Sequence, residues 1–364
     1  MTALFSRKCL FFFGSFAGNL ASLCLIGASS GGPACAETST LQEFALPRAP
    51  QTPGTPYYEA ARPSSLVVGP DRAIWFIEVS GRKVGRIDMN GAITEFSIPG
   101  KEPGLSREIS LQSITPGPDG ALWFTDVESN KIGRITTDGV TKEFDLPFVK
   151  IPGFPLFPVQ PFGIAAGRDG ALWFTEAGAN AIGRMTVAGE VTEFKLPHAD
   201  SSPRSITAGP DGALWFTEAT GGRIGRITTA GKISEYELPV SDATPWGIVA
   251  GPDNALWFVE NPGNAVARIA PDGSITEFPL PSPDRYLDTI GLGPDGALWF
   301  LGSRSIGRTT VKGEILEYMA PIENADPFSV VAGPDGALWL AGERQDKFLR
   351  APADGRGFKL RPQN

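Results

Sequence analysis

The chain has 364 residues, a formal charge of −8 at pH 7, three cysteines and one histidine. This negative charge argues against a nucleic-acid-binding protein, because basic surfaces supply most of the affinity for nucleic acid. It fits a soluble protein, or one that attracts cationic ligands.

Residues 1–36 are predicted to be a secretory signal peptide. Arg7 and Lys8 precede an apolar run over residues 10–26, and an A-x-A motif ends at Ala36. This is the layout of a cleaved export signal. A retained membrane or lipid anchor is the alternative, but polar and glycine residues interrupt the apolar run.

Export determines several further expectations. All three cysteines lie in the signal segment, so the mature chain 37–364 has no disulfide and no cysteine nucleophile. Losing two basic residues leaves 30 basic and 40 acidic side chains, a formal charge of −10. We expect a periplasmic or secreted monomer that has no membrane contact after signal cleavage and does not bind nucleic acid.

The remaining chain is built from a repeated unit. Its anchor tryptophans recur every 40 to 50 residues, which is the length of a four-stranded propeller blade. They are Trp75, Trp123, Trp173, Trp215, Trp257, Trp299 and Trp339. The fold class is therefore all-β, and residues 37–364 are predicted to form one seven-bladed β-propeller of four-stranded antiparallel blades.

Each unit reads as four strands in chain order, and the third copy is typical. Strand one lies near residues 163–167, and an Asp-Gly turn leads to strand two at 171–176, which is apolar on both faces. Strand three is of the type IGRITT, and strand four, TEF-x-LP, ends at a proline. The Asp of the turn and the Arg of strand three recur in all seven copies, which favours a structural pair over a site.

Two segments can complete the last blade. A strand-four motif at residues 41–46 precedes the first tryptophan copy, and a weaker one at Phe358–Leu360 follows the last. We expect residues 41–46 to form the outer strand and the C-terminal segment to be surplus or frayed. The opposite assignment is the alternative.

Two positions recur where strand one begins and strand two ends, beside each other near the central channel. The strand-one ring lies eleven residues before each tryptophan: Ser64, Gln112, Phe162, Arg204, Trp246, Asp288 and Phe328. The strand-two ring lies three residues after each tryptophan: Glu78, Asp126, Glu176, Glu218, Glu260, Gly302 and Gly342.

The two rings predict different chemistry at the channel mouth. The strand-one ring is mixed, as a binding surface would be, and the ligand-binding residues are predicted to be Gln112, Phe162, Arg204, Trp246, Asp288 and Phe328. The strand-two ring would place carboxylates around one mouth, where they raise each other's pKa or bind a cation. The predicted metal ligands are Glu176, Glu218 and Glu260. Alternatively, these carboxylates accept hydrogen bonds from backbone N–H groups at the strand ends.

The connections into the first three copies are long. They contain Tyr57 and Tyr58, residues 100–110, and the Phe- and Pro-rich stretch 148–162. On the face of the two rings, they would form an apolar rim for a fairly large, partly apolar ligand. Loops packed over neighbouring blades are the alternative.

The sequences of the repeats resemble those of one known family. The units GPDGALWFTE, IGRITT and TEF-x-LP are similar to those of the virginiamycin B lyases, or streptogramin lyases, over about residues 41–350. The resemblance implies elimination at an ester of a cyclic streptogramin, a histidine base, and Mg²⁺ held by carboxylates.

The histidines implied by the resemblance are not present at the matching positions. The family's histidines, which precede Gly-Ile on strand one, would fall on Asp288 and Phe328, and its glutamate on Gly342. The single histidine, His198, lies six residues before Arg204, so the catalytic residues are unknown. Glu176, Glu218 or Glu260 would serve as a base only with a pKa raised toward neutral.

Three functions follow as hypotheses. The first is a binding module for a small-molecule, polysaccharide or protein ligand at the channel mouth. The second is a Mg²⁺-dependent carbon–oxygen lyase that opens a streptogramin-like cyclic ester. The third is a lactone hydrolase of the kind seen in other propellers with acidic metal sites.

Overall fold

The computed structural model describes residues 41–47, 61–79, 81–99, 111–150, 155–240, 243–282, 286–302, 305–319, 327–342 and 346–362. All of them belong to one compact unit, Glu37–Asn364. Strands form seven four-stranded antiparallel sheets and one two-stranded ribbon. Among these residues there is no helix with the length and apolarity needed to cross a membrane.

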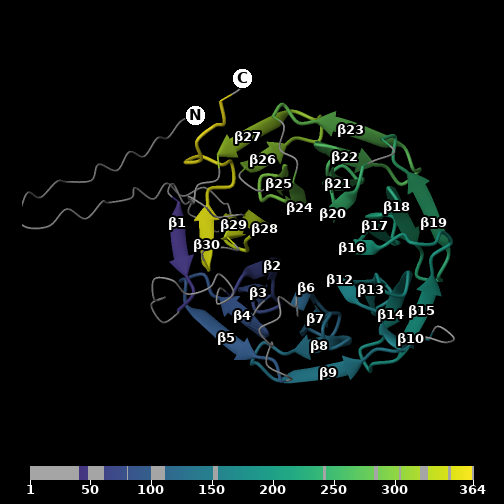
Figure 1. Cartoon of the computed structure of the whole chain (residues 1–364). Coiled ribbons are helices and arrows are strands. Elements are labelled where there is room, and N and C mark those ends of the chain that lie inside the picture. The colour runs from purple at the N-terminus through teal and green to yellow at the C-terminus, as the bar shows by residue number, and fades with distance from the viewer. Residues whose placement is uncertain are drawn as a thin grey trace, which may run out of the picture. The chain divides into compact units, whose positions relative to one another are not determined.

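The sheets are arranged around a central axis as the blades of a seven-bladed β-propeller, with the first strand of each blade innermost (Figure 1). Blade 1 comprises β2 (Pro63–Val68), β3 (Ile74–Glu78), β4 (Lys83–Ile87) and β5 (Ile93–Ser97). Blade 2 comprises β6 (Leu111–Pro116), β7 (Leu122–Asp126), β8 (Lys131–Ile135) and β9 (Thr141–Asp145). Blade 3 comprises β12 (Pro161–Ala166), β13 (Leu172–Glu176), β14 (Ala181–Met185) and β15 (Val191–Lys195).

The remaining blades repeat this order. Blade 4 comprises β16 (Pro203–Ala208), β17 (Leu214–Glu218), β18 (Arg223–Ile227) and β19 (Ile233–Glu237). Blade 5 comprises β20 (Pro245–Ala250), β21 (Leu256–Glu260), β22 (Ala265–Ile269) and β23 (Ile275–Pro279). Blade 6 comprises β24 (Leu287–Leu292), β25 (Leu298–Gly302), β26 (Ser305–Thr309) and β27 (Ile315–Met319). Blade 7 comprises β28 (Pro327–Ala332), β29 (Leu338–Gly342), β30 (Lys347–Ala351) and β1 (Gln42–Ala45).

The N-terminal strand closes the ring, as the sequence predicted. Strand β1 pairs antiparallel with β30, so the outer strand of blade 7 comes from the beginning of the chain. Phe44 of β1 stacks on Trp339 at a centroid distance of 5.4 Å. The same strand-four aromatic stacks on the tryptophan of the other six blades.

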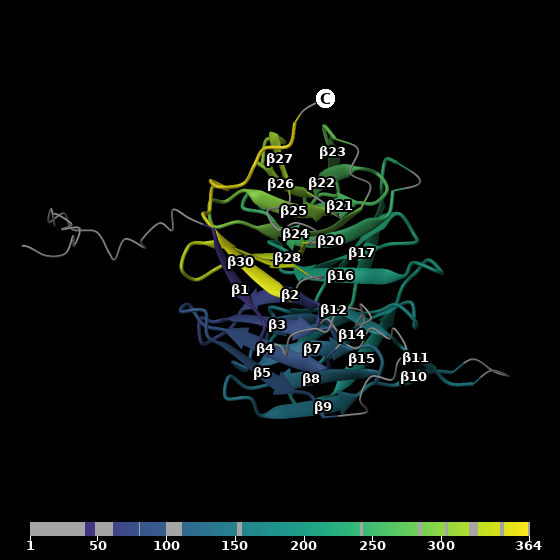
Figure 2. The ribbon, with the colours of Figure 1, turned by 60° about the vertical axis from the view of Figure 1, so that its left-hand side comes forward.

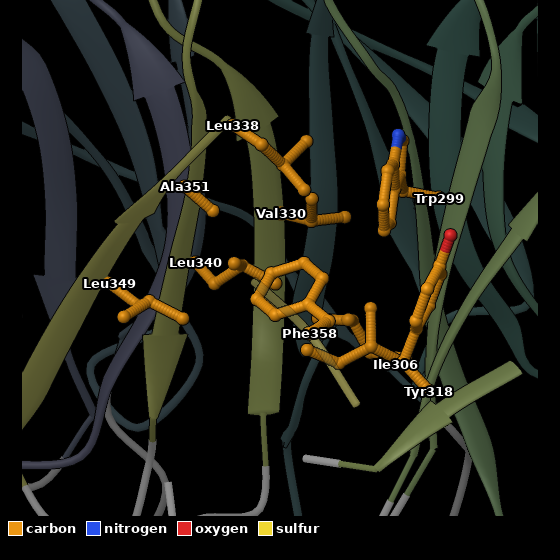
Figure 3. Packing of buried hydrophobic residues seen from close by; sticks show 10 residues of the cluster. Trp299, Ile306, Tyr318, Val330, Leu338, Leu340, Leu349, Ala351 and Phe358 are labelled. Carbon is orange, nitrogen blue, oxygen red and sulfur yellow. The ribbon is translucent and has the colours of Figure 1, made fainter. Parts of the chain in front are cut away.

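The C-terminal segment is packed and is not surplus, which differs from the prediction. Phe358 is 8% exposed and contacts Trp299 and Tyr318 of blade 6 (Figure 3). The backbone N–H of Met319 donates to the carbonyl of Lys359. The apolar Phe358 side chain, which follows the last blade strand in the chain, thus covers the outer edge of blade 6.

The repeated Asp and Arg form a structural pair within each blade. In blade 3, Asp169 accepts hydrogen bonds from the indole N–H of Trp173 and from Arg184. Burial alone would raise the pKa of Asp169, but these two hydrogen bonds outweigh it and hold the pKa below its ordinary value. Across the seven blades the Arg–Asp distances are 2.5 to 2.7 Å. The pair fixes the turn over the tryptophan, which is fully buried in every blade.

The connection into blade 3 carries a small ribbon. Strands β10 (Phe148–Val149) and β11 (Phe157–Pro158) pair antiparallel at the outer side of blade 3 (Figure 1 and Figure 2). Phe148 is 53% exposed and Leu156 is 60% exposed, whereas Val159 is buried. Tyr57, Tyr58 and residues 100–110, the other predicted parts of the rim, lie outside the described residues.

Candidate ligand-binding site

The channel mouth is formed where the innermost strands begin. Each of these strands pairs with strand two of its own blade and also lies against the innermost strand of the next blade. Gly163 illustrates how close this approach is, since a Cβ there would lie 2.5 Å from the carbonyl oxygen of Arg204. A residue at the start of β12 therefore reaches its neighbour in the next blade directly.

Three members of the strand-one ring form a stack across blades 3, 4 and 5. The guanidinium carbon of Arg204 lies 4.1 Å from the ring centroid of Phe162 and 5.6 Å from that of Trp246. All three side chains are half-buried. Each cation–π contact of this kind stabilises the arrangement by about 0.5–2 kcal/mol, depending on how far the cation is removed from water.

The backbone beneath this stack is fixed by three threonines. The hydroxyls of Thr125, Thr175 and Thr217 donate to the carbonyl oxygens of the stacked residues at 2.7 to 2.8 Å, each from the preceding blade. These threonines are fully buried. The other blades have apolar residues at this position: Ile77, Val259, Leu301 and Ala341. The threonine support therefore coincides with Phe162, Arg204 and Trp246.

The guanidinium of Arg204 makes no ion pair or hydrogen bond to the rest of the described chain, and its Nε is enclosed. Burial lowers the pKa of Arg204 from its ordinary value. The nearest acid in register is Glu218, the partner of Pro203, and it pairs with Arg223 at 3.1 Å. Arg204 is therefore a cation at the mouth without an ion-pair partner among the described residues.

The other predicted binding residues do not join this stack. Gln112 and Asp288 are half-buried at the starts of β6 and β24, and Asp288 has contacts of its own. Ser64 is 1% exposed. The side chain of Phe328 lies outside the described part of the chain. Of the six predicted ligand-binding residues, the structure brings Phe162, Arg204 and Trp246 together.

The strand-two ring lies in a different environment from the one predicted. Its five acids, expected around an open mouth, are 0–1% exposed: Glu78, Asp126, Glu176, Glu218 and Glu260. Each shares a sheet face with a strand-four glutamate and lies beside the preceding blade. Strand two is buried on both faces, so the end of the strand is enclosed as well.

A cation lies opposite or beside the acid in blades 2 and 4. Arg82 from blade 1 reaches Asp126 at 2.6 Å and Glu143 at 3.6 Å. In blade 4, Glu218 is the register partner of Arg223 and pairs with it. Removing the charge on either arginine would leave a carboxylate enclosed between blades without its partner.

Alanine takes the cation's place in blades 3 and 5. Glu176 is the register partner of Ala181, and Glu260 is the register partner of Ala265. Burial, together with the like charge of Glu193, raises the pKa of Glu176 from 4.5 to about 8. Burial and the like charge of Glu277 raise the pKa of Glu260 to about 7. With no cation in register on strand three, burial and a like charge outweigh Lys195 and hold the pKa of Glu176 well above its ordinary value.

The described residues do not fit a three-ligand magnesium site. No three Asp, Glu, His or Cys side chains gather there closely enough to hold a metal ion. Glu176, Glu218 and Glu260, the predicted ligands, face three separate blade interfaces. Magnesium binding therefore stays a prediction.

No acid of the strand-two ring is placed to act as a general base. Glu176 and Glu260 have pKa values near neutral, as a base needs, but they are at most 1% exposed. A base must come within hydrogen-bond reach of the proton that it removes. His198 is exposed, and its Nδ1 contacts Glu235 between blades 3 and 4. That contact gives His198 a partner outside the strand-one ring.

A model of the virginiamycin B lyase family matches residues 40–147 and 105–351. The chain belongs to the virginiamycin B lyase family. A streptogramin B lyase structure has 35% sequence identity and a TM-score of 0.74, and the match covers 85% of this chain and 97% of that one. Comparison with curated proteins gave no match.

Further structures of this lyase family are also similar to the chain. Virginiamycin B lyase from Staphylococcus aureus has 37% identity and a TM-score of 0.73, covering 85% of this chain and 98% of its own. A catalytically inactive histidine-to-alanine variant of that enzyme with quinupristin gives the same values. Hydrazine synthase from Kuenenia stuttgartiensis, at 17% identity and a TM-score of 0.64, shares the fold alone.

Sequence reasoning did not identify the three supporting threonines or the role of Arg82. Their signal was present in the repeat, because the position before each strand-two acid is threonine in blades 2, 3 and 4 only. Arg82 was hidden because its partners are in the next blade, more than forty residues along the chain.

Proposed function

We propose that this chain is a ligand-binding member of the virginiamycin B lyase family that works without the family's histidine chemistry. The ligand is partly apolar and is held at the channel mouth over blades 3 to 5. The observation that carries the proposal is the Phe162–Arg204–Trp246 stack, which joins three neighbouring members of the strand-one ring.

The character of the stack supports binding. Two aromatic rings and a guanidinium offer flat surfaces to a ligand, and aromatic and arginine side chains dominate binding energy in many sites. The threonine hydrogen bonds hold the backbone in place before a ligand arrives, so less ordering is needed on binding. Phe162, Arg204 and Trp246 themselves supply no general base at neutral pH.

A carbon–oxygen lyase is the second candidate, and family membership at 35–37% identity favours it. In that case an unidentified group of this chain would remove the α-proton. A lactone hydrolase is a weaker candidate of the same kind. Each requires a metal-dependent change in the chain, which a thermal melt with and without Mg²⁺ measures.

One experiment separates binding from catalysis. Quinupristin, the compound present with the Staphylococcus aureus variant, is incubated with the purified protein and Mg²⁺. Binding is followed by isothermal titration calorimetry and ring opening by mass spectrometry. We expect saturable binding that Trp246→Ala abolishes, and no ring-opened product. Mg²⁺-dependent ring opening, or no binding at all, would contradict the proposal.

We also propose that the protein acts in the periplasm or outside the cell. The charged start, apolar run and A-x-A motif of residues 1–36 support this. N-terminal sequencing of the protein from a bacterial host is expected to begin at Glu37. A chain that retains residues 1–36 would overturn the export proposal and leave the binding proposal unaffected.

A further inference from the structure

An arginine at the channel mouth lacks an anionic partner. Arg204 is half-buried, its Nε is enclosed without a hydrogen-bond partner, and its side chain makes no ion pair in the described part of the chain. The recurrent Arg86 and its six counterparts all pair with aspartate. Arg204 therefore stands apart from the structural arginines of the fold.

The Arg204 guanidinium lies over two aromatic rings. Its carbon is 4.1 Å from the ring centroid of Phe162 in blade 3 and 5.6 Å from that of Trp246 in blade 5. A guanidinium packed by its faces can still donate hydrogen bonds in its own plane. The terminal nitrogens are thus the part of Arg204 that is left for a ligand.

The surrounding chain holds this geometry without neutralising it. Thr175 fixes the carbonyl of Arg204, and Thr125 and Thr217 fix those of its two aromatic neighbours. Glu218, the closest acid in register, is directed to Arg223 instead. The positive charge is therefore positioned at the mouth and remains available.

We propose that Arg204 binds the carboxylate, or a phosphate of similar shape, of the ligand held at the channel mouth. This rests on the proposed function and narrows its ligand to an anionic compound with an apolar or aromatic part. The terminal nitrogens donate in-plane to two oxygens of the anion, while Phe162 and Trp246 contact the apolar part. Partial burial beside the two rings lowers the local dielectric around the guanidinium, which strengthens the charge-assisted hydrogen bonds.

Trp246 provides a direct reporter for this site. The chain has eight tryptophans, and seven of them are 0% exposed, whereas Trp246 is half-buried at the mouth. Changes in its emission therefore report on Arg204's surroundings. The variant Trp246→Phe identifies the part of the signal that comes from this residue.

The test compares benzoate with benzamide, a neutral compound of the same shape, by titration of the full protein. We expect benzoate to bind at least about tenfold more tightly, since a hydrogen-bonded charge pair contributes more than its neutral counterpart. Arg204→Gln should remove this difference, and Arg204→Lys should retain only part of it. Arg168→Gln, an equal charge change at an exposed turn, should leave it unchanged.

Inorganic phosphate serves as the second arm. Displacement of benzoate by phosphate would identify a general oxyanion site, and no displacement a carboxylate site. Equal binding of benzoate and benzamide by the parent protein would overturn the anion site but leave the proposed binding function standing. A preference for benzoate that persists in a folded Arg204→Gln protein would also overturn it. Failure of both compounds and of quinupristin would refute both proposals.

Discussion

The two rings differ in environment although they begin as neighbours. In blade 3, Pro161 is the register partner of Glu176, so Phe162 and Glu176 start beside each other. Phe162 is half-buried and contacts Arg204 at the mouth, whereas Glu176 is fully buried between blades. The comparison teaches that adjacent ends of one hairpin can have different surroundings, an aromatic–cation stack at the mouth in one case and blade packing in the other.

A second contrast lies within the strand-two ring. Asp126 and Glu218 have arginine partners, while Glu176 and Glu260 face alanine and have pKa values near neutral. Burial, together with a strand-four glutamate, raises the pKa of Glu176 and Glu260, which have no cation in register on strand three. Substitutions in the strand-two ring should change stability, and those in the strand-one ring should change binding.

The largest effect is expected where a paired acid loses its cation. Arg82→Ala leaves Asp126 enclosed without the guanidinium at 2.6 Å. We expect a loss of about 3–5 kcal/mol in the free energy of unfolding at pH 7, as for other broken buried pairs. Urea denaturation measures it, with Arg168→Ala at an exposed turn as the control. A loss as small as that of the control would show that Asp126 does not depend on Arg82.

Neutralising Glu176, which has no arginine partner, should increase the stability of the protein. The pKa of Glu176 is about 8 in the folded chain against an ordinary value of 4.5, so the folded chain binds more protons between these values. The contribution of Glu176 to the free energy of unfolding is therefore fully present below about pH 4.5 and is lost as the pH rises to about 8. Glu176→Gln cannot ionise, and at pH 8 it should be more stable than the parent by roughly 2–4 kcal/mol.

The pH series provides the control for this prediction. At pH 4, Glu176→Gln and the parent should have similar free energies of unfolding, because the carboxyl group is then protonated in both states. Glu260→Gln should behave alike with a smaller gain, since its folded pKa is about 7. A Glu176→Gln variant that is less stable than the parent at pH 8 would contradict the account.

A smaller loss of stability is expected when blade 4 is given the alanine that blade 3 has opposite its buried acid. Arg223→Ala removes the partner of Glu218, whose pKa burial already raises. We expect destabilisation of about 1–3 kcal/mol at pH 7, because a buried charged group loses its hydrogen-bonded partner. The loss should shrink as pH falls and Glu218 becomes protonated. A loss that is the same at pH 5 and pH 8 would mean that the charge of Glu218 is not involved.

The smallest effect on stability is expected at the mouth. Arg204→Gln removes two cation–π contacts from a half-buried side chain that has no ion pair. The free energy of unfolding should fall by about 1 kcal/mol or less. Thermal and urea unfolding check this. A loss comparable with that of Arg82→Ala would assign Arg204 to the structural framework.

The sequence allowed the blades to be predicted, and the reason is physical. The arginine pairs with the aspartate in all seven blades, and the tryptophan indole donates to the aspartate in every blade except blade 6, so their spacing identifies the repeat. The position of Phe162, Arg204 and Trp246 in one ring was also predictable. Their mutual contact was not, because it joins residues of three blades that lie forty-two residues apart in the chain.

The direction of the strand-two acids was not predictable from alternation. Strand two is apolar and buried on both faces, so the sequence pattern does not distinguish the channel from the blade interface. A register shift between Pro161 and Ile164 also interrupts the count along strand one. The raised pKa of Glu176 comes from burial and from the like charge of Glu193, and only the paired strands place Glu193 on the same face.

Two residues of one hairpin, Phe162 and Glu176, can show which of the two rings contributes to ligand binding. Quinupristin affinity is measured for the parent protein, Phe162→Ala and Glu176→Gln at pH 7, after unfolding curves have verified that all three are folded. The account predicts binding that is at least about tenfold weaker in Phe162→Ala and within about twofold of the parent in Glu176→Gln. The reverse order, with binding lost in Glu176→Gln and kept in Phe162→Ala, would contradict it.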